Sequence, residues 1–135
     1  MNASLVTGLQ APTGIVVSGS NLFVVNFSNC SCGRIDEYTT SGALEQASLI
    51  TGLFGPVGIA VSGSNLFVSY LGDAGENIGE YTTSGATVSD PLIANLGGGN
   101  TSVSDIAVVP VPEASTNLLI LGGVIGLAAV ARRMR

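Results

Sequence analysis

The sequence predicts an all-β fold of about two four-stranded units and part of a third, followed by a C-terminal transmembrane helix. Three observations lead to this prediction. The composition favours strands and turns, a stretch of about 44 residues is repeated, and an apolar run lies near the C-terminus. Together they divide the chain into repeats over residues 1–109, a linker over 110–116, a helix over 117–131 and a basic tail over 132–135.

The composition supports the all-β prediction for the first part of the chain. Among 135 residues there are 19 glycines and many serines and threonines, whereas tryptophan, histidine and lysine do not occur. Such a composition suits short strands and tight turns better than long helices. With the C-terminal segments set aside, about 110 residues remain, which is enough for one small domain.

The charge is divided sharply along the chain. Arg34 is the only basic residue in positions 1–116, so this part carries a formal charge of −8. Recognition of a nucleic-acid backbone needs clustered lysine and arginine on a folded surface. The sequence therefore excludes nucleic acid as a partner.

An internal repeat is the strongest signal in the body of the chain. The stretch that begins at Ser4, SLVTGLQAPTGIVVSGSNLFVV, aligns with SLITGLFGPVGIAVSGSNLFVS from Ser48. Further on, IDEYTTSGA from Ile35 matches IGEYTTSGA from Ile78, with one residue lost between them. Self-similarity at this period is typical of repeat architectures built from one supersecondary unit.

The repeat gives two copies and part of a third, at about residues 4–47, 48–90 and 91–109. Each copy contains four short segments with strand patterns, separated by the turn sequences SGS and TTSG. In the first copy these segments are TGIVV, NLFVV, RIDEY and ALEQASLI. A rhythm of strand, tight turn and strand at this period indicates the blades of a propeller or a related β-repeat array.

The repeats resemble those of the NHL-type β-propeller family over about residues 2–109. The resemblance is carried by APTGIVVSGSNLFVVN and GPVGIAVSGSNLFVSY, each followed by EYTTSG. It implies that Gly14 and Gly58 lie where an inner strand enters the crowded centre, where a missing Cβ permits close backbone approach. We expect Gly19 and Gly63 to adopt the positive φ of a hairpin turn.

Two blades and part of a third cannot close a ring, because propellers use about four to eight blades. Several chains could complete a ring, the blades could form an open stack, or the sequence could belong to a longer protein. We expect the last, because NASL at Asn2 matches the repeat interior QASL at Gln46 and no signal peptide precedes it.

The apolar run over residues 117–131 predicts a short transmembrane helix. Its 15 residues would span about 22 Å as a helix, against a hydrocarbon core of about 30 Å. Snorkelling of the basic residues that follow makes this length sufficient. Arg132, Arg133 and Arg135 orient the helix with the C-terminus in the cytoplasm and the body outside. The alternatives are a plain tail anchor or a buried core helix, although the run has no polar face.

A proline-glutamate motif, an apolar helix and an arginine cluster, in this order, resemble the PEP-CTERM sorting signal of Gram-negative envelope proteins. The resemblance covers about residues 110–135, with Ala114 where that family usually has a second proline. It implies recognition by a membrane-embedded processing enzyme of the exosortase class and release or re-attachment of the body at the cell surface. The residues of the implied sorting motif are Val111, Pro112, Glu113, Ala114, Ser115 and Thr116.

The residue types offer little for catalysis. The absence of histidine removes the usual general base, the serine–histidine triads and most zinc sites. Glu37 and Glu80 occupy equivalent repeat positions, which favours a shared surface role over a catalytic pair. The loop over 73–77, DAGEN, offers oxygens to calcium but lacks the carboxylates of a full site. Cys30 and Cys32 are interpreted as loop cysteines, with a strained disulfide, a metal role or cross-linking of a dimer as alternatives.

We therefore expect an exported, non-enzymatic protein of the cell surface or extracellular matrix, with no catalytic residue, metal site or cofactor. Its expected partners are the membrane, an exosortase-type enzyme and an exopolysaccharide. The alternative is a fragment of a propeller enzyme, or of a carbohydrate- or protein-binding module, whose site lies on blades outside this sequence.

Overall fold

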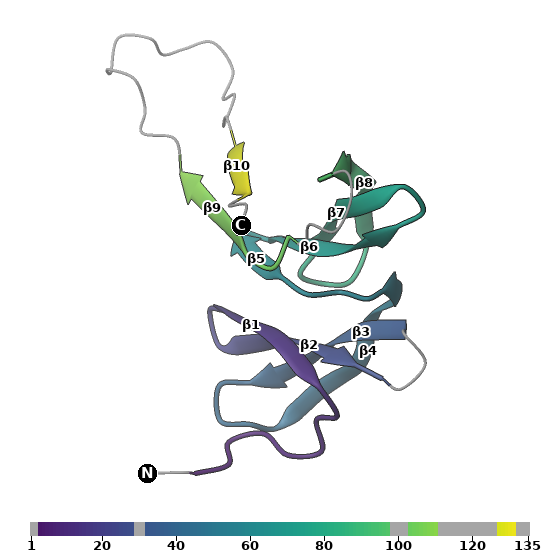
Figure 1. Ribbon diagram of the computed structural model, residues 1–135. Helices are drawn as coiled ribbons and strands as arrows, with labels where there is room; N and C mark the ends of the chain where they lie inside the picture. The colour runs from purple at the N-terminus through teal and green to yellow at the C-terminus, as the bar shows by residue number, and fades with distance from the viewer. Residues whose placement is uncertain (1–2, 29–31, 98–102, 111–126, 132–135) are drawn as a thin grey trace, which may run out of the picture.

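The computed structural model describes residues 3–28, 32–97, 103–110 and 127–131, and these residues form an all-β structure (Figure 1). Two four-stranded antiparallel sheets make up the body. Sheet 1 consists of β1 (Pro12–Ser18), β2 (Asn21–Phe27), β3 (Cys32–Thr39) and β4 (Leu44–Phe54). Sheet 2 consists of β5 (Ile59–Ser62), β6 (Asn65–Gly72), β7 (Gly75–Thr82) and β8 (Thr87–Leu96). A third pair is formed by β9 (Ile106–Pro110) and β10 (Leu127–Ala131).

Each four-stranded sheet is a simple meander, in which every strand pairs with the next one along the chain. The first hairpin of each sheet turns at a glycine with positive φ, +58° at Gly19 and +57° at Gly63. A side chain is disfavoured in this conformation, which explains why both copies keep glycine in the SGSN turn. The prediction for these two glycines is confirmed.

The fourth strand extends further than the sequence pattern predicts. Strand β4 continues to Phe54, so the apparent start of the second copy at Ser48 lies inside this strand. Likewise Pro91–Leu96 belongs to β8, although the predicted third copy began there. Bulges in the pairing of β3 with β4 let the long strand bend around the sheet. The structural unit is therefore shifted by several residues from the sequence repeat.

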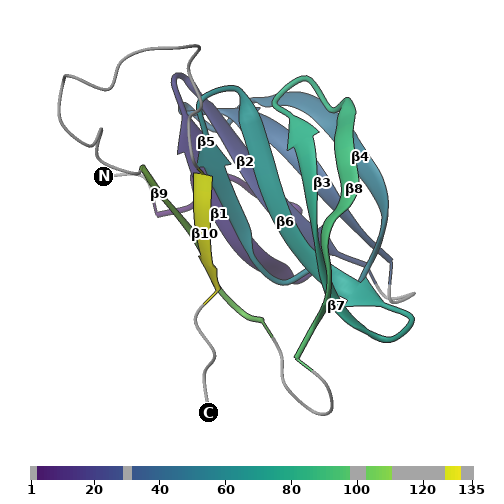
Figure 2. The ribbon, with the colours of Figure 1, turned by 90° about the horizontal axis from the view of Figure 1, so that it is seen from above.

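The two sheets lie face to face, and the main apolar core fills the space between them (Figure 2). Sheet 1 contributes side chains such as Phe23 and Ile35, and sheet 2 contributes Leu66 and Val68. A second cluster, which includes Phe67, lies on the other face of sheet 2, toward β9. A third cluster on the outer face of sheet 1 is formed by Leu22, Val24 and Tyr38, with Val6 and Leu9 packed against it.

Residues 3–10 lie against sheet 1 in the place that β4 holds against sheet 2. An ideal Cβ on Gly42 would lie 2.0 Å from the carbonyl oxygen of Leu5, and one on Gly85 would lie 2.7 Å from that of Leu49. Because Leu5 and Leu49 are equivalent repeat positions, these two close approaches are the same contact. The relation between consecutive units is thus repeated at the N-terminal side of sheet 1.

The close backbone approach expected at Gly14 and Gly58 is present. A Cβ on Gly14 would lie 3.2 Å from the carbonyl oxygen of Val57, and one on Gly58 would lie 3.4 Å from that of Ser104. Both glycines therefore allow the first strand of one unit to approach the backbone that leads into the next. Equivalent contacts recur at both junctions because each unit is placed on its neighbour in the same way.

The C-terminal prediction differs from the structure at residues 127–131. These residues, expected as the end of a helix, form strand β10, which pairs antiparallel with β9 from Leu127 opposite Pro110 to Ala131 opposite Ile106. Pairing satisfies backbone groups that β9 would otherwise expose along one edge, and this favours a strand. No helix long and apolar enough to cross a membrane occurs in the described part of the chain. Residues 117–126 lie outside the described residues.

Candidate functional site

A polar cavity of about 430 Å³ lies between residues 4–8 and the β3–β4 hairpin. This volume is within the range of small-molecule pockets. The cavity is formed because residues 3–10 lie on sheet 1 as a single segment and leave space beside the hairpin. Its lining residues are Ser4, Leu5, Thr7, Gly8, Arg34, Asp36, Tyr38, Gly42, Leu44 and Ala47.

Strand geometry places the three functional side chains of the cavity on one face. Arg34, Asp36 and Tyr38 alternate along β3, so they share the outer face of sheet 1. The register of β2 and β3 sets Asn26 opposite Arg34. Asn26 therefore belongs to the same cluster, although it lies on the neighbouring strand.

The Asp36 carboxylate is the centre of this cluster and is almost fully buried, with 1% of its surface exposed. Arg34 donates from Nε to both carboxylate oxygens, at 2.9 and 3.0 Å. Asn26 donates from Nδ2 at 3.1 Å, and the backbone N–H of Ser48 donates at 2.7 Å. With four such bonds the carboxylate is held by structural donors, so it suits orienting Arg34 better than accepting a proton from a substrate.

Arg34 and Tyr38 give the cavity its donors. The Arg34 side chain is partly exposed and lines the cavity, and the Asp36 carboxylate holds its Nε. Burial raises the pKa of Tyr38 above its ordinary value, and the Asp36 carboxylate raises it further, while Arg34 acts in the opposite direction. The phenol thus stays protonated at neutral pH, as a polar group that suits hydrogen bonding to a small polar ligand.

The second unit does not reproduce this cluster. The positions equivalent to Asn26, Arg34 and Asp36 are Tyr70, Asn77 and Gly79.

Tyr70 and Tyr81 lie at the corresponding place in the second unit. The Tyr70 hydroxyl donates to the Asp90 carboxylate, whereas the Tyr81 hydroxyl is buried without a hydrogen-bond partner among the described residues. Burial is the main cause that raises the pKa of Tyr70 to about 12 and that of Tyr81 still higher, and Asp90 adds to both shifts.

Glu37 and Glu80 have matching roles in the two units. Glu37 accepts a hydrogen bond from Asn21 Nδ2 at 2.5 Å, and Glu80 accepts one from Asn65 Nδ2 at 2.7 Å. Each bond links the second and third strands of its sheet next to the first hairpin turn. This arrangement indicates a repeated structural contact.

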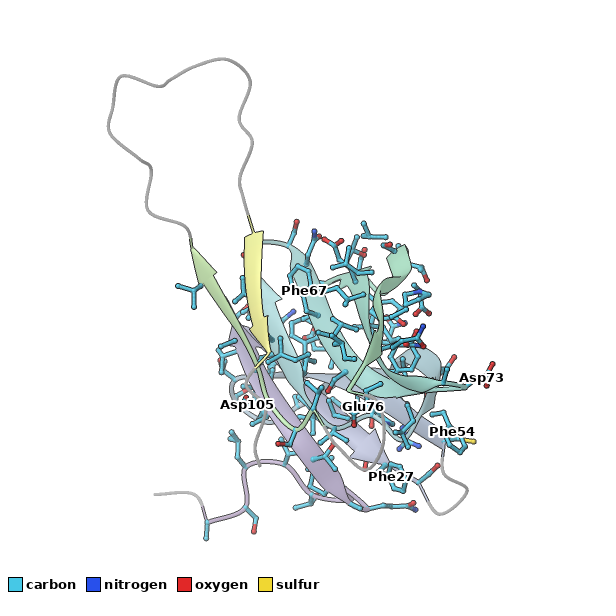
Figure 3. All side chains as sticks on the ribbon, turned by 45° about the horizontal axis from the view of Figure 1, so that its top comes forward. Phe27, Phe54, Phe67, Asp73, Glu76 and Asp105 are labelled. Atoms are coloured by element: carbon cyan, nitrogen blue, oxygen red, sulfur yellow. The ribbon has the colours of Figure 1, made fainter. Side chains whose placement is uncertain are left out.

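The acidic residues of the DAGEN loop point in different directions. Asp73 lies at the tip of the β6–β7 hairpin, whereas Glu76 is buried and accepts a hydrogen bond from the backbone N–H of Val103 (Figure 3). Asp105 lies well away from the hairpin tip in the same view. Within the described ranges, no group of three or more potential ligand side chains could hold a metal ion.

Several sequence-predicted residues lie outside the described residues. They include the whole sorting motif, from Val111 to Thr116, the three C-terminal arginines and Cys30. Cys32 begins β3 and is exposed. The alternatives for the two cysteines therefore remain predictions from the sequence.

The cavity cluster was missed by reasoning from motifs. One signal could have found it, because Asn26, Arg34 and Asp36 are positions where the two otherwise similar copies differ in chemical type. Divergence at three positions that the strand register brings together marks a face with a unit-specific role.

No protein-family model, curated protein or solved structure matches the chain.

Proposed function

We propose that the chain is an exported, non-enzymatic protein of the bacterial cell surface or extracellular matrix, delivered by a C-terminal sorting signal. The body is a propeller-type repeat module, and an exosortase-type enzyme processes the signal. The observation that carries this proposal is the order of three features, the motif over 111–116, the apolar run over 117–131 and the arginine cluster over 132–135.

Each of the three features contributes a separate step to sorting. Entry of the apolar run into the bilayer lowers its free energy, because leucine, isoleucine and valine favour the membrane interior. The arginines keep the C-terminus in the cytoplasm. Pro112 prevents the proposed helix from extending toward the body. Glu113 would then lie in extended chain on the non-cytoplasmic side of the membrane, where a processing enzyme can reach it.

The body supports a role in recognition or structure. Its two units repeat the same hairpin turns, the same Asn–Glu pairs and the same junction contacts. Its carboxylates Asp36, Glu37 and Glu80 serve as hydrogen-bond acceptors within the fold. A repeated scaffold with carboxylates occupied in this way suits display of a surface better than acid–base chemistry.

The proposal requires residues 127–131 to leave β9 when the segment enters a membrane. Only five residue pairs join β10 to β9. Each backbone hydrogen bond contributes a net of about 0.5–1.5 kcal/mol in water, and a helix in the bilayer makes its own. Insertion of the whole apolar run therefore offsets the loss of this short pairing.

Fractionation of cells tests the sorting proposal. The full chain is expressed behind a cleavable secretory signal peptide in a Gram-negative host, beside a variant with Arg132, Arg133 and Arg135 changed to serine. We expect the unchanged chain in the inner membrane, and the variant to lose this retention. Identical distribution of the two proteins contradicts the proposal.

The polar cavity favours a second candidate function, binding of a neutral saccharide unit of an exopolysaccharide. Arg34 and Tyr38 supply donors and an aromatic ring in a cavity of suitable volume. Residues 1–116 carry a charge of −8, which repels polyanions and favours an uncharged sugar.

Binding to immobilised polysaccharide tests this second candidate. The probes are dextran, which is neutral, and alginate, which is anionic. We expect the protein to bind dextran in preference to alginate, and Arg34→Met to weaken dextran binding at least tenfold. Equal binding by the variant, or a preference for alginate, rules the site out.

A further inference from the structure

The first strands of the successive units lie side by side in one stack. Strand β5 contacts β1, and β9 contacts β5 (Figures 1 and 2). Side chains on one face of each strand pack on the preceding sheet. Ile59 and Val61 of β5 pack into the core against sheet 1, and Ile106 and Val108 of β9 pack against sheet 2. The stack therefore uses one contact twice.

The equivalent face of β1 is open. Ile15 and Val17 hold the positions of Ile59 and Val61, yet they are 59% and 57% exposed, while Ile59 is only 8% exposed. Ile15 and Val17 are thus exposed to solvent, although their equivalents in the next unit pack in the core. Two such apolar side chains next to each other indicate an interaction surface.

The other end of the stack presents the complementary face. Strand alternation places Ala107 and Val109 on the side of β9 that faces away from sheet 2, and both are exposed. Ala107 is equivalent to Val16 of β1 and Ala60 of β5, each of which packs against the next unit, and Val109 stands where β1 and β5 have Ser18 and Ser62. One molecule thus holds both halves of the junction that it uses internally.

We propose that a second copy of this chain docks head to tail, with Ile15 and Val17 of one copy against Ala107 and Val109 of the next. The partner is a second copy because the open faces reproduce the two sides of an interface already formed twice within the molecule. The stack β1, β5, β9 then continues into β1 of the next copy.

The proposed contact joins two different surfaces, so each copy keeps one open face after docking. Such heterologous contacts build closed rings when the rotation between copies allows it, and open chains otherwise. Docking of further copies therefore extends the array of repeat units beyond those of one chain. This inference concerns the body alone and does not depend on the sorting signal.

The mass of the full-length protein in mild detergent tests the proposal, measured by light scattering over a range of concentrations. We expect assemblies larger than the 13.5 kDa chain, and we expect both Val17→Glu and Val109→Glu to be monomeric. Each variant keeps one intact face. An equimolar mixture of the two is therefore expected to form dimers, which a two-fold symmetric contact would not produce.

Val88→Glu is the matched control. Val88 is 51% exposed on β8, and Glu45 at the equivalent position stays exposed although sheet 2 packs against sheet 1. This variant loses the same side chain and gains the same charge, and we expect it to assemble like the unchanged protein. A monomeric unchanged protein, a monomeric Val88→Glu, an assembled Val17→Glu, or a mixture that does not pair would each overturn the proposal.

Discussion

Asp36 is the residue on which the polar cluster of sheet 1 depends. It joins β2, β3 and β4, because its carboxylate accepts from Asn26, Arg34 and the backbone of Ser48. Removing it leaves the buried Asn26 amide without this acceptor, a loss that typically costs about 1–3 kcal/mol, and the part-buried bonds from Arg34 and Ser48 are lost as well. The residue therefore supports the fold and orients Arg34 at the same time.

We predict that Asp36→Ala lowers the free energy of unfolding by about 2–4 kcal/mol, because several donors lose their partner together. Urea unfolding followed by circular dichroism measures the change. Asp73→Ala serves as the control, since Asp73 is exposed at a hairpin tip, and we expect a change within about 0.5 kcal/mol. Similar values for the two variants would contradict the cluster's role.

Tyr81 carries a buried hydroxyl without a partner among the described residues. We predict that Tyr81→Phe leaves the free energy of unfolding unchanged or raises it by about 1 kcal/mol, because an unsatisfied polar group is removed. Tyr70→Phe is the comparison, since it deletes the hydrogen bond to Asp90. We expect it to cost about 0.5–1.5 kcal/mol. The reverse order of the two variants would show that the Tyr81 hydroxyl is bonded.

Tyr70 makes stability depend on alkaline pH. Folding raises its pKa from 10.0 to about 12, so the folded state holds a proton that the unfolded chain releases. The contribution is fully present below pH 10 and is lost as the pH rises toward 12. Urea midpoints across this interval are expected to fall less steeply in Tyr70→Phe than in the unchanged protein. An equal fall of the urea midpoint in both proteins would show that Tyr70 does not cause the pH dependence.

At the scale of the strands, the hairpin after the third strand is positioned by contact with the preceding unit. Gly85 has a φ of +89°, and a Cβ there would lie 2.7 Å from the carbonyl oxygen of Leu49. Gly63 has a φ of +57° with nothing within 4 Å. Alanine would strain the backbone at both positions because φ is positive, but only at Gly85 would its methyl group also lack space.

We predict that Gly85→Ala destabilises the protein by about 1–3 kcal/mol more than Gly63→Ala, because only the first adds a steric clash to the strain. Thermal and urea unfolding of the two variants give the comparison. Equal losses would mean that the β7–β8 hairpin moves freely relative to β4, and would remove the evidence for a fixed junction between the units.

The strands of each unit were predictable because their apolar alternation and turn residues act locally. The SGSN turns and the four strand segments of each copy follow from such patterns. The length of β4 was not predictable in this way, since its second half, from Ser48, pairs around a bulge and packs against the next sheet. Long-range packing, and not local preference, determines where that strand ends.

At the scale of the whole molecule, the repeat predicted two similar sheets but not the polar cluster on the outer face of sheet 1. The cavity forms where residues 3–10 lie beside the β3–β4 hairpin, and its Asp36 cluster needs donors from three separate residues to converge. Neither feature leaves a contiguous motif. The strand at 127–131 was missed for a related reason, because an apolar run satisfies its backbone equally well in a helix or beside an open strand edge.

In the proposed function, a C-terminal sorting signal directs these units to the cell surface, and this is the central claim about function. Its motif stands between the body and the apolar run, so processing there separates the two. The processed chain would keep both sheets and β9, which are the parts that form the repeated junctions.

The intact mass of the mature chain tests this claim most directly. The full chain, exported by an added secretory signal peptide, is purified from a host that contains an exosortase-type enzyme and from one that lacks it. We predict loss of the apolar run and the arginines only in the first host, and no loss when Pro112 and Glu113 are both changed to alanine. A chain that keeps its full 13.5 kDa in both hosts would contradict the account.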